Sequence, residues 1–210
     1  IGAIAANCVK SIAKKKKVIP GIFIAIHTFG RNLKRNVHIH LSTTAGGLSF
    51  DGNKWKKLFF KQSSLMKIWR YQIISLFRSK YNLLVIPNHI KQQLNHTYTL
   101  KHFLDELYQK NWIVHCDKTS DNFDMIINYL ARYTKRPPIA EAKLKHYDGN
   151  EVIFKFLDHK SKTFCKCILT VDQFISKFIQ HIPDLGFRMI RYYGFLANRV
   201  RGKLLSIIYQ

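Results

Sequence analysis

Two short motifs, far apart in the chain, hold the side chains best suited to chemistry. His38 and His40 flank a single isoleucine, and Tyr129 and Tyr133 are four residues apart. On a strand, alternate side chains share one face, so the two histidines could hold one cation. On a helix, residues four apart stack on one face, so both phenols could point toward that cation. A metal ion beside two phenolic nucleophiles suits cleavage of a phosphodiester. The alternatives are a pair of exposed strand histidines and a packed aromatic stripe.

The charge of the chain indicates what these groups act on. The sequence has 210 residues, with 35 Lys and Arg against 12 Asp and Glu, so its formal net charge is +23. Such an excess makes a compact protein repel itself unless a polyanion binds it, and nucleic acid is the leading partner. The alternative is a basic protein without such a partner. An anionic membrane is not expected, because the longest uncharged apolar stretch, 18–26, is too short to span a bilayer and no lipidation motif is present.

The cysteines and the first residues bear on where the protein acts. The four cysteines have neither paired-ligand nor disulfide-framework spacing, which predicts reduced thiols and a cytoplasmic location. Cys165 and Cys167 would share one face of a strand, where zinc binding is the alternative to reduced thiols. The chain starts at Ile1 rather than Met, and its opening lacks the features of a signal peptide. We therefore expect a fragment whose natural start has been lost.

Periodicity predicts an α+β fold, with a central antiparallel sheet that carries the His-x-His motif, helices on its flanks, and the tyrosine pair on a helix. A break is expected at Pro20 and Gly21. The expected helices are 1–13, 54–81, 100–110, 120–133 and 170–182, the last opened by a capping box of Thr170 and Gln173; the expected strands are 22–28, 37–43, 112–116, 142–147, 152–157 and 163–169. A basic aromatic tail, 187–201, follows, and the expected division is a catalytic domain at 1–182 and a C-terminal segment at 183–210.

Three sequence blocks together resemble the two-tyrosine transposases, which are rolling-circle enzymes of the His-hydrophobe-His nuclease superfamily. The first block joins His-Thr-Phe-Gly at 27–30, the histidine motif and Gly-Gly-Leu at 46–48. The second is the tyrosine motif followed by Arg-Pro-Pro-Ile-Ala at 136–140, and the third is Gly-Phe at 186–187 with Ile-Arg-Tyr-Tyr-Gly-Phe-Leu at 190–196. The blocks occur in the order of the family and cover nearly the whole chain. Members of the family usually begin with a zinc-binding region and a strand that have no counterpart here.

The resemblance implies a metal-dependent transposase that cuts and joins one DNA strand through a 5′-phosphotyrosine. Tyr129 or Tyr133 would be the nucleophile, and His38 and His40 would bind Mg²⁺ or Mn²⁺, the latter better suited to imidazole. The third ligand would be His27, on the neighbouring strand, although Asn128 or Asp124 are alternatives and His27 could instead fix the hairpin by a hydrogen bond. The expected DNA-binding residues are Arg132, Lys135, Arg136, Arg191 and Tyr192. For Arg191 and Tyr192 the alternative is packing on the core.

The expected partner is single-stranded DNA, at transposon ends and at the target, in a bacterial cytoplasm and in association with the nucleoid. Host replication machinery is a further expected partner, and the sequence assigns no oligomeric state. Two other functions remain open: an inactive basic DNA-binding remnant, and a rolling-circle replication initiator or relaxase, which uses the same chemistry on another substrate. The C-terminal block of Arg-Tyr-Tyr-Gly-Phe at 191–195 favours the transposase.

Overall fold

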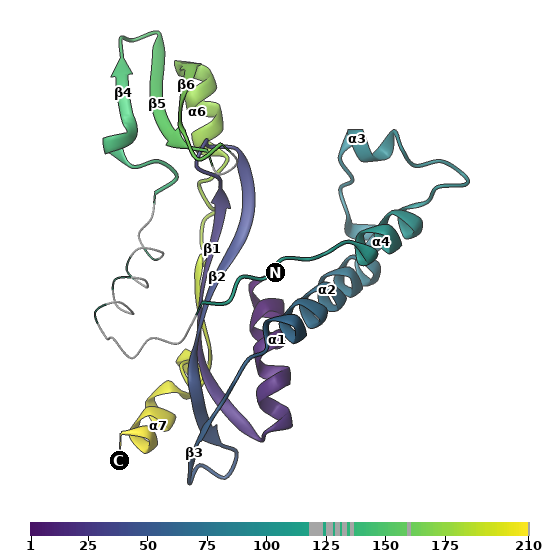
Figure 1. Ribbon diagram of the computed structural model, residues 1–210, viewed down its shortest axis with the longest axis vertical. Coiled ribbons are helices and arrows are strands. Elements are labelled where there is room, and N and C mark those ends of the chain that lie inside the picture. The colour runs from purple at the N-terminus through teal and green to yellow at the C-terminus, as the bar shows by residue number, and fades with distance from the viewer. Residues whose placement is uncertain are drawn as a thin grey trace. The chain divides into compact units, whose positions relative to one another are not determined.

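The computed structural model describes residues 1–117, 124, 128, 131, 134, 137–158 and 161–209. The fold is α+β, as predicted (Figure 1). A four-stranded sheet has the order β3-β2-β1-β7, and a three-stranded sheet has the order β4-β5-β6. The strands are β1 (Val18–Phe29), β2 (Arg35–Ser49), β3 (Trp55–Lys57), β4 (Leu144–Tyr147), β5 (Glu151–Leu157), β6 (Phe164–Thr170) and β7 (Ile190–Gly194).

Helices account for most of the remaining regular structure. The α-helices are α1 (Gly2–Lys15), α2 (Gln62–Ser79), α3 (Asn88–Lys91), α4 (Leu100–Gln109), α6 (Val171–Ile179) and α7 (Asn198–Ile208), and the 3₁₀ turns are η1 (Tyr81–Leu83) and η2 (Glu141–Lys143). The chain divides into two compact units, 1–22 with 43–119 and 193–210, and 23–42 with 120–192. The long strands β1 and β2 run through both. The expected division at 182 therefore stays a prediction.

The first unit is built on helices. Small side chains of α1, among them Ala6 and Ala13, are completely buried. A second cluster joins α2 to α4 through Ile74, Leu100 and Leu104, all at most 5% exposed. The helices predicted at 1–13 and 100–110 are confirmed with shifts of one or two residues at their ends.

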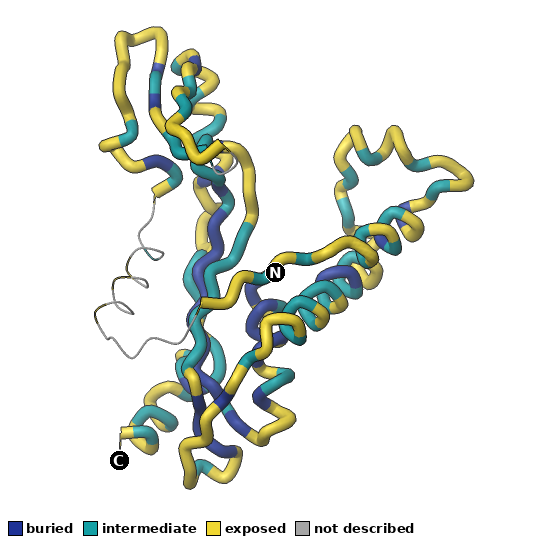
Figure 2. The backbone as a smooth tube through the Cα atoms, viewed as in Figure 1, coloured by how far each residue is buried: buried dark blue, intermediate teal, exposed yellow. Residues whose placement is uncertain are grey.

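The second unit contains the three-stranded sheet, which α6 covers on one face. Val152 and Phe154 of β5 are buried, and Phe154 packs against Phe174 of α6 with ring centroids 6.3 Å apart. The predicted capping box is present: the amide of Gln173 donates to the Thr170 hydroxyl at 3.3 Å. The strands predicted at 142–147, 152–157 and 163–169 are confirmed as β4, β5 and β6, which pair antiparallel in that order. Figure 2 shows two buried positions along β5 with an intermediate position between them.

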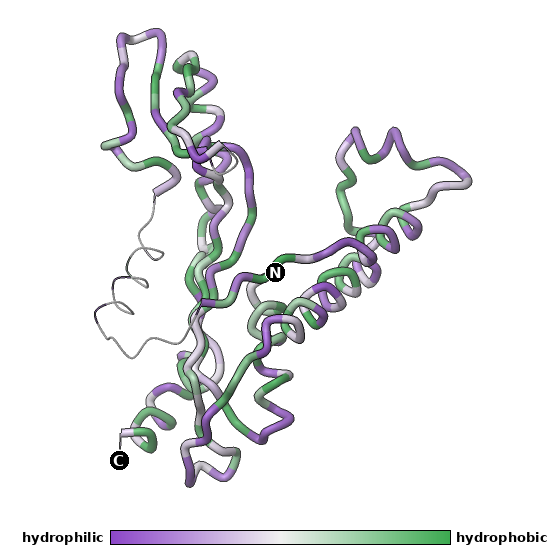
Figure 3. Tube along the Cα trace, viewed as in Figure 1, coloured by the Kyte–Doolittle hydropathy of each residue, from purple (hydrophilic) through white to green (hydrophobic). Residues whose placement is uncertain are grey.

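Strand β1 is the most buried element of the chain. Its residues are buried at ten of twelve positions, and Figure 3 shows the hydrophobic character of its course. The predicted break at Pro20 and Gly21 is wrong, since both residues lie within β1. Neighbouring strands hold them: the amide of Phe195 donates to the Pro20 carbonyl at 3.2 Å, and the Gly21 amide donates to the Thr44 hydroxyl at 3.0 Å. Pairing on both sides outweighs the local tendency of these residues to turn.

Two further predictions are wrong at particular residues. The helix predicted at 54–81 starts only at Gln62, because Trp55–Lys57 form β3 and pair antiparallel with β2. Gly46 allows this, since a Cβ there would come within 2.8 Å of the carbonyl oxygen of Lys56. The strand predicted at 112–116 is absent from this described segment; instead the Trp112 indole donates to the carbonyl of Leu107 in α4 at 2.8 Å.

The C-terminal residues belong to the sheet. The segment expected to be a tail contributes β7, which lies beside β1. The two strands are antiparallel, since the amide of Ile26 donates to the Met189 carbonyl while that of Phe195 donates to the Pro20 carbonyl.

In the part of the chain that the structure describes, no helix is both long and apolar enough to cross a membrane.

Gly194 ends β7 in a conformation that a side chain would disturb. Its φ is +64°, and an added Cβ would overlap the carbonyl oxygen of Pro20. We expect Gly194→Ala to lower the free energy of unfolding by about 2 kcal/mol or more, because the left-handed conformation alone costs about 1–2 kcal/mol. Denaturant unfolding followed by circular dichroism would measure this.

Gly202 offers the matched control for this substitution. It lies in α7, and an added Cβ would meet nothing within 4 Å. Gly202→Ala should be neutral or stabilising by up to about 1 kcal/mol. Equal stability of the two variants would contradict the packing described at Gly194.

Candidate metal centre

Three histidine side chains converge on the central sheet. His27 comes from β1, and His38 and His40 come from β2. The ring centroid of His27 lies 5.4 Å from that of His38 and 4.8 Å from that of His40, and the two β2 rings are 5.0 Å apart. One ligand atom from each residue lies within 4.8 Å of the other two. The alternation of side chains along β2 therefore places both motif histidines beside the neighbouring strand, as the sequence predicts.

The cluster is shielded on one side and accessible on the other. His27 is 4% exposed, while His38 and His40 are half-buried. The ring of His27 stacks on Phe29 of the same strand, with centroids 5.2 Å apart and planes 14° from parallel. A metal ion held by these three residues would contact the buried His27 on one side, and its remaining coordination positions could face solvent beside His38 and His40.

A backbone carbonyl orients one of the imidazoles. Nδ1 of His38 lies 2.8 Å from the carbonyl oxygen of Asn36. Since a carbonyl only accepts, this contact requires a proton on Nδ1, and in the neutral imidazole the lone pair is then on Nε2. This is the arrangement by which ligating histidines in proteins are usually held. The sequence could not predict this contact, because any residue two positions before His38 would offer the same backbone carbonyl.

A fourth histidine supports the hairpin that carries the cluster. His181, just beyond α6, is 6% exposed, and its ring lies 5.8 Å from that of Phe29. Its Nε2 donates to the carbonyl of Leu33 at 3.1 Å, and its Nδ1 lies 3.2 Å from the hydroxyl of Thr28. No sequence pattern singles out His181, which lies 148 residues from Leu33.

The set of donors fits a divalent transition metal. Three nitrogens spread evenly around one ion at about 2.1 Å are at most about 3.6 Å apart, so the ligand atoms, which lie within 4.8 Å of one another, would need to approach by up to about 1.2 Å. Imidazole ligands suit Mn²⁺ and its neighbours better than Mg²⁺, which prefers oxygen. Among the described His, Cys, Asp and Glu residues, these three histidines form the one group with metal-ligand spacing; Asp124 is not part of it.

Comparison with known proteins places this centre in a family. A family model described as "Putative transposase" matches residues 21–203, which include all three histidines. The chain belongs to the two-tyrosine transposase family. It is 37% identical over 200 residues to the transposase for insertion sequence element IS801 of Pseudomonas savastanoi pv. phaseolicola, a match that covers 94% of this chain and 48% of the relative.

A second curated relative shows the same coverage. The protein named "Putative transposase y4qJ", of Sinorhizobium fredii (strain NBRC 101917 / NGR234), is 28% identical over 193 residues, which are 89% of this chain and 48% of the relative. The chain thus spans about half the length of the curated relatives it matches. No solved structure matches it.

The nucleophiles that the sequence predicts for a member of this family lie outside the described residues, as do three of the cations expected beside them. This applies to Tyr129, Tyr133, Arg132, Lys135 and Arg136. The four described positions of that segment, Asp124, Asn128, Ala131 and Thr134, are helical, in agreement with the predicted helix.

The C-terminal candidates lie on β7. The Tyr192 ring packs edge-on against Phe23 of β1, with centroids 5.6 Å apart, and Tyr192 remains 40% exposed. The Arg191 guanidinium lies 5.3 Å from the centre of the Phe187 ring and donates to the Arg188 carbonyl at 3.1 Å. Both side chains therefore pack locally while keeping some surface accessible, so their role in DNA binding stays a prediction.

We expect His38→Ala to abolish tight binding of Mn²⁺ by the transposase chain. The loss should exceed the roughly 10- to 100-fold cost of removing a supporting group around a metal ligand, because a ligand itself is lost. Titration followed by the electron paramagnetic resonance of free Mn²⁺ measures the affinity. His96→Ala, at an exposed histidine outside the cluster, is the control and should bind as the parent does. Equal affinity of the two variants would rule out the cluster as the binding site.

We expect His181→Ala to weaken Mn²⁺ binding by about 10-fold, although His181 is not among the clustered histidines. The reason is the loss of the bond that holds Leu33, at the turn between β1 and β2. His181→Gln, whose amide can donate to the same carbonyl, should recover part of the affinity. The same titration tests this. If His181→Ala lowers the melting temperature but leaves the affinity for Mn²⁺ unchanged, the residue supports the fold alone.

Proposed function

We propose that this chain carries the nicking and joining centre of a rolling-circle transposase, which cuts single-stranded DNA through a 5′-phosphotyrosine. The observation that supports this most is the convergence of His27, His38 and His40 in a member of the two-tyrosine family. The relatives carry the name transposase, and this chain spans about half of their length, so the activity of the whole protein is part of the proposal.

The three histidines would hold a divalent cation, Mn²⁺ or Mg²⁺. When bound, the ion supplies polarisation of the scissile phosphate and offsets charge on the departing 3′ oxygen. The residues contribute the geometry: His27 is buried and stacked on Phe29, and the proton on Nδ1 of His38 directs its other nitrogen to the ligand position. Neutral imidazoles add no charge of their own to the phosphate site.

Tyr129 or Tyr133 would be the nucleophile. Its phenolate oxygen bonds to phosphorus as the bond from phosphorus to the 3′ oxygen breaks, and the 3′ oxygen takes up a proton to become a hydroxyl. A phenol has an ordinary pKa of about 10, so positive charge is needed nearby. In the sequence Arg132, Lys135 and Arg136 are close enough to supply it.

The covalent intermediate conserves the energy of the cleaved bond for rejoining. A 3′ hydroxyl, from the donor or the target, can attack the phosphotyrosine and release the phenol. With two tyrosines, one can hold the first cut end while the other makes a second cut. This is what transfer of a single strand from a donor to a target requires.

Covalent trapping tests the proposal. The chain would be incubated with a pool of end-labelled single-stranded oligonucleotides and Mn²⁺, then separated under denaturing conditions. We expect a labelled protein adduct that disappears in excess chelator, in His38→Ala and in one or both of Tyr129→Phe and Tyr133→Phe. His96→Ala should form as much adduct as the parent.

The controls decide between catalysis and binding. A longer protein, extended to the length of the curated relatives, would be run beside this chain. An adduct that persists without metal or in both tyrosine variants would refute the assigned roles. If neither protein forms an adduct while both bind the DNA, the chain is a DNA-binding member of the family without nuclease activity.

A further inference from the structure

The three-stranded sheet has one covered face and one face open to solvent. Paired residues of antiparallel strands share a face, so the register assigns the side chains. On the covered face, Val152 pairs with Leu169 and Phe154 with Cys167, beneath α6. The alternate pairs lie on the open face: Glu151 with Thr170, Ile153 with Ile168, Lys155 with Lys166, and Leu157 with Phe164.

The open face exposes large apolar groups. Phe164 is 75% exposed and Ile168 is 57% exposed, on the same strand and two pairs apart. Leaving an aromatic ring this open forgoes most of the stabilisation that its burial would give. Neither residue belongs to the core cluster on the covered face.

Between these apolar groups stand two lysines in direct register. Lys155 and Lys166 are both exposed, and like charges directly opposite each other destabilise an antiparallel pair. Within the described ranges, neither lysine makes an ion pair. Glu151 is the carboxylate on this face, two pairs away from the lysines along β5. An anion placed between Lys155 and Lys166 would relieve their repulsion.

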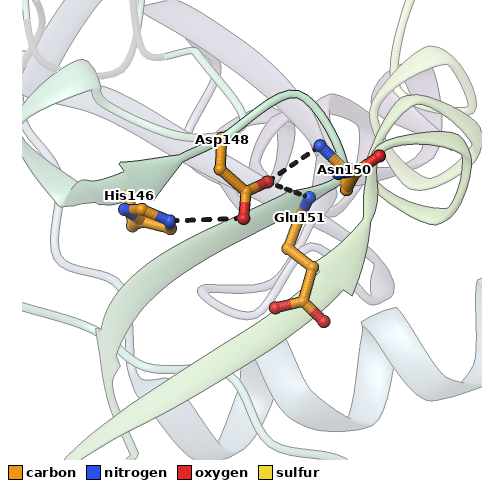
Figure 4. Close-up of polar contacts among 4 residues, drawn as sticks. All are labelled: His146, Asp148, Asn150 and Glu151. Carbon is orange, nitrogen blue, oxygen red and sulfur yellow. Dashed lines mark hydrogen bonds and ion pairs between the residues drawn. The ribbon is translucent and has the colours of Figure 1, made fainter.

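The hairpin that presents this face is held by its own turn. Figure 4 shows Asp148 accepting from the backbone amides of Glu151 and Asn150, both at 2.8 Å, with Nε2 of His146 at 3.6 Å from its other oxygen. These contacts, that of the Glu151 amide foremost, lower the pKa of Asp148 below its ordinary value. The turn carboxylate is therefore occupied, and the face is formed before any ligand arrives.

We propose that the open face of β4, β5 and β6 binds single-stranded DNA, with a phosphate between Lys155 and Lys166 and an unpaired base on the ring of Phe164. Alternating cations and aromatic rings are the features by which proteins hold single strands without reading sequence. Duplex DNA is a poorer fit, because its bases stack on each other and present no free ring face. The choice of DNA rests on the proposed function, whereas the anion and the stacked ring follow from the face itself.

Fluorescence anisotropy with a labelled, mixed-sequence single strand tests the face in the full chain. We expect Lys155→Ala combined with Lys166→Ala to weaken binding about fivefold or more. The double variant should also reduce the magnitude of the slope of log affinity against log salt by about 0.7, because the two lysines together neutralise one phosphate of the single strand. Phe164→Ala should weaken single-strand binding by about fivefold or more, the cost of removing one base stack, with little change in the salt slope.

A second double variant controls for charge alone. Lys101→Ala combined with Lys110→Ala removes the same two charges at exposed positions in α4 and just after it, and should cost clearly less. All the substituted residues are exposed, so circular dichroism should show no loss of melting temperature in any of these variants. The proposal is overturned if the face variants bind within about twofold of the parent, if the α4 control loses as much, or if duplex DNA binds as tightly as the single strand with the same dependence on Phe164.

The adduct assay separates this proposal from the proposed function. If the parent forms an adduct while the face variants bind like the parent, the nuclease assignment stands and the face assignment fails. If the face variants lose binding while neither the parent nor the longer protein forms an adduct, the face assignment stands and the nuclease assignment fails.

Discussion

The candidate centre depends on how the turn between β1 and β2 is fixed. Leu33 adopts a left-handed conformation, with φ of 59°, and is fully buried against the core of the three-stranded sheet. Its carbonyl accepts from His181, while the Gly30 amide donates to the carbonyl of Lys34 at 2.8 Å. A slip of one residue in this hairpin would turn His38 and His40 to the other face. Core packing, a buried hydrogen bond and the turn thus set one register, and the register brings the histidines together.

Charge is the second constraint on the molecule. The chain carries a net charge of +23, yet among the described residues few ion pairs are found; Arg78 pairs with Asp105, and His146 lies 3.6 Å from Asp148, which is an ion pair only when the imidazole is protonated. Most of the cations therefore face solvent and contribute to a positive field. That field disfavours the compact state and favours binding of polyanions. Under the proposed function, bound DNA would offset this self-repulsion, and the lysine pair on β5 and β6 is a local instance of opposed like charges.

Much of the architecture could be predicted because its signals are local. The shared face of His38 and His40 on β2 and the capping box at Thr170 each depend on residues close together in the sequence, and both are found in the structure. The failures have a non-local cause. Residues 55–57 have a helical pattern in the sequence but pair with β2, where Gly46 leaves room for them. Pro20 is kept in β1 by the strands on both sides of it.

The sequence by itself determined the family, the fold class and the pair of histidines that share a face, because motif order, composition and a period of two are properties of neighbouring residues. The tertiary structure decided which further residues join them. His27 meets His38 and His40 through strand pairing, and His181 reaches Thr28 across 153 residues of chain. No spacing rule marks such partners, since their approach is set by sheet register and core packing rather than by position in the sequence. The register of β5 and β6 likewise places Lys155, Lys166 and Phe164 on one open face.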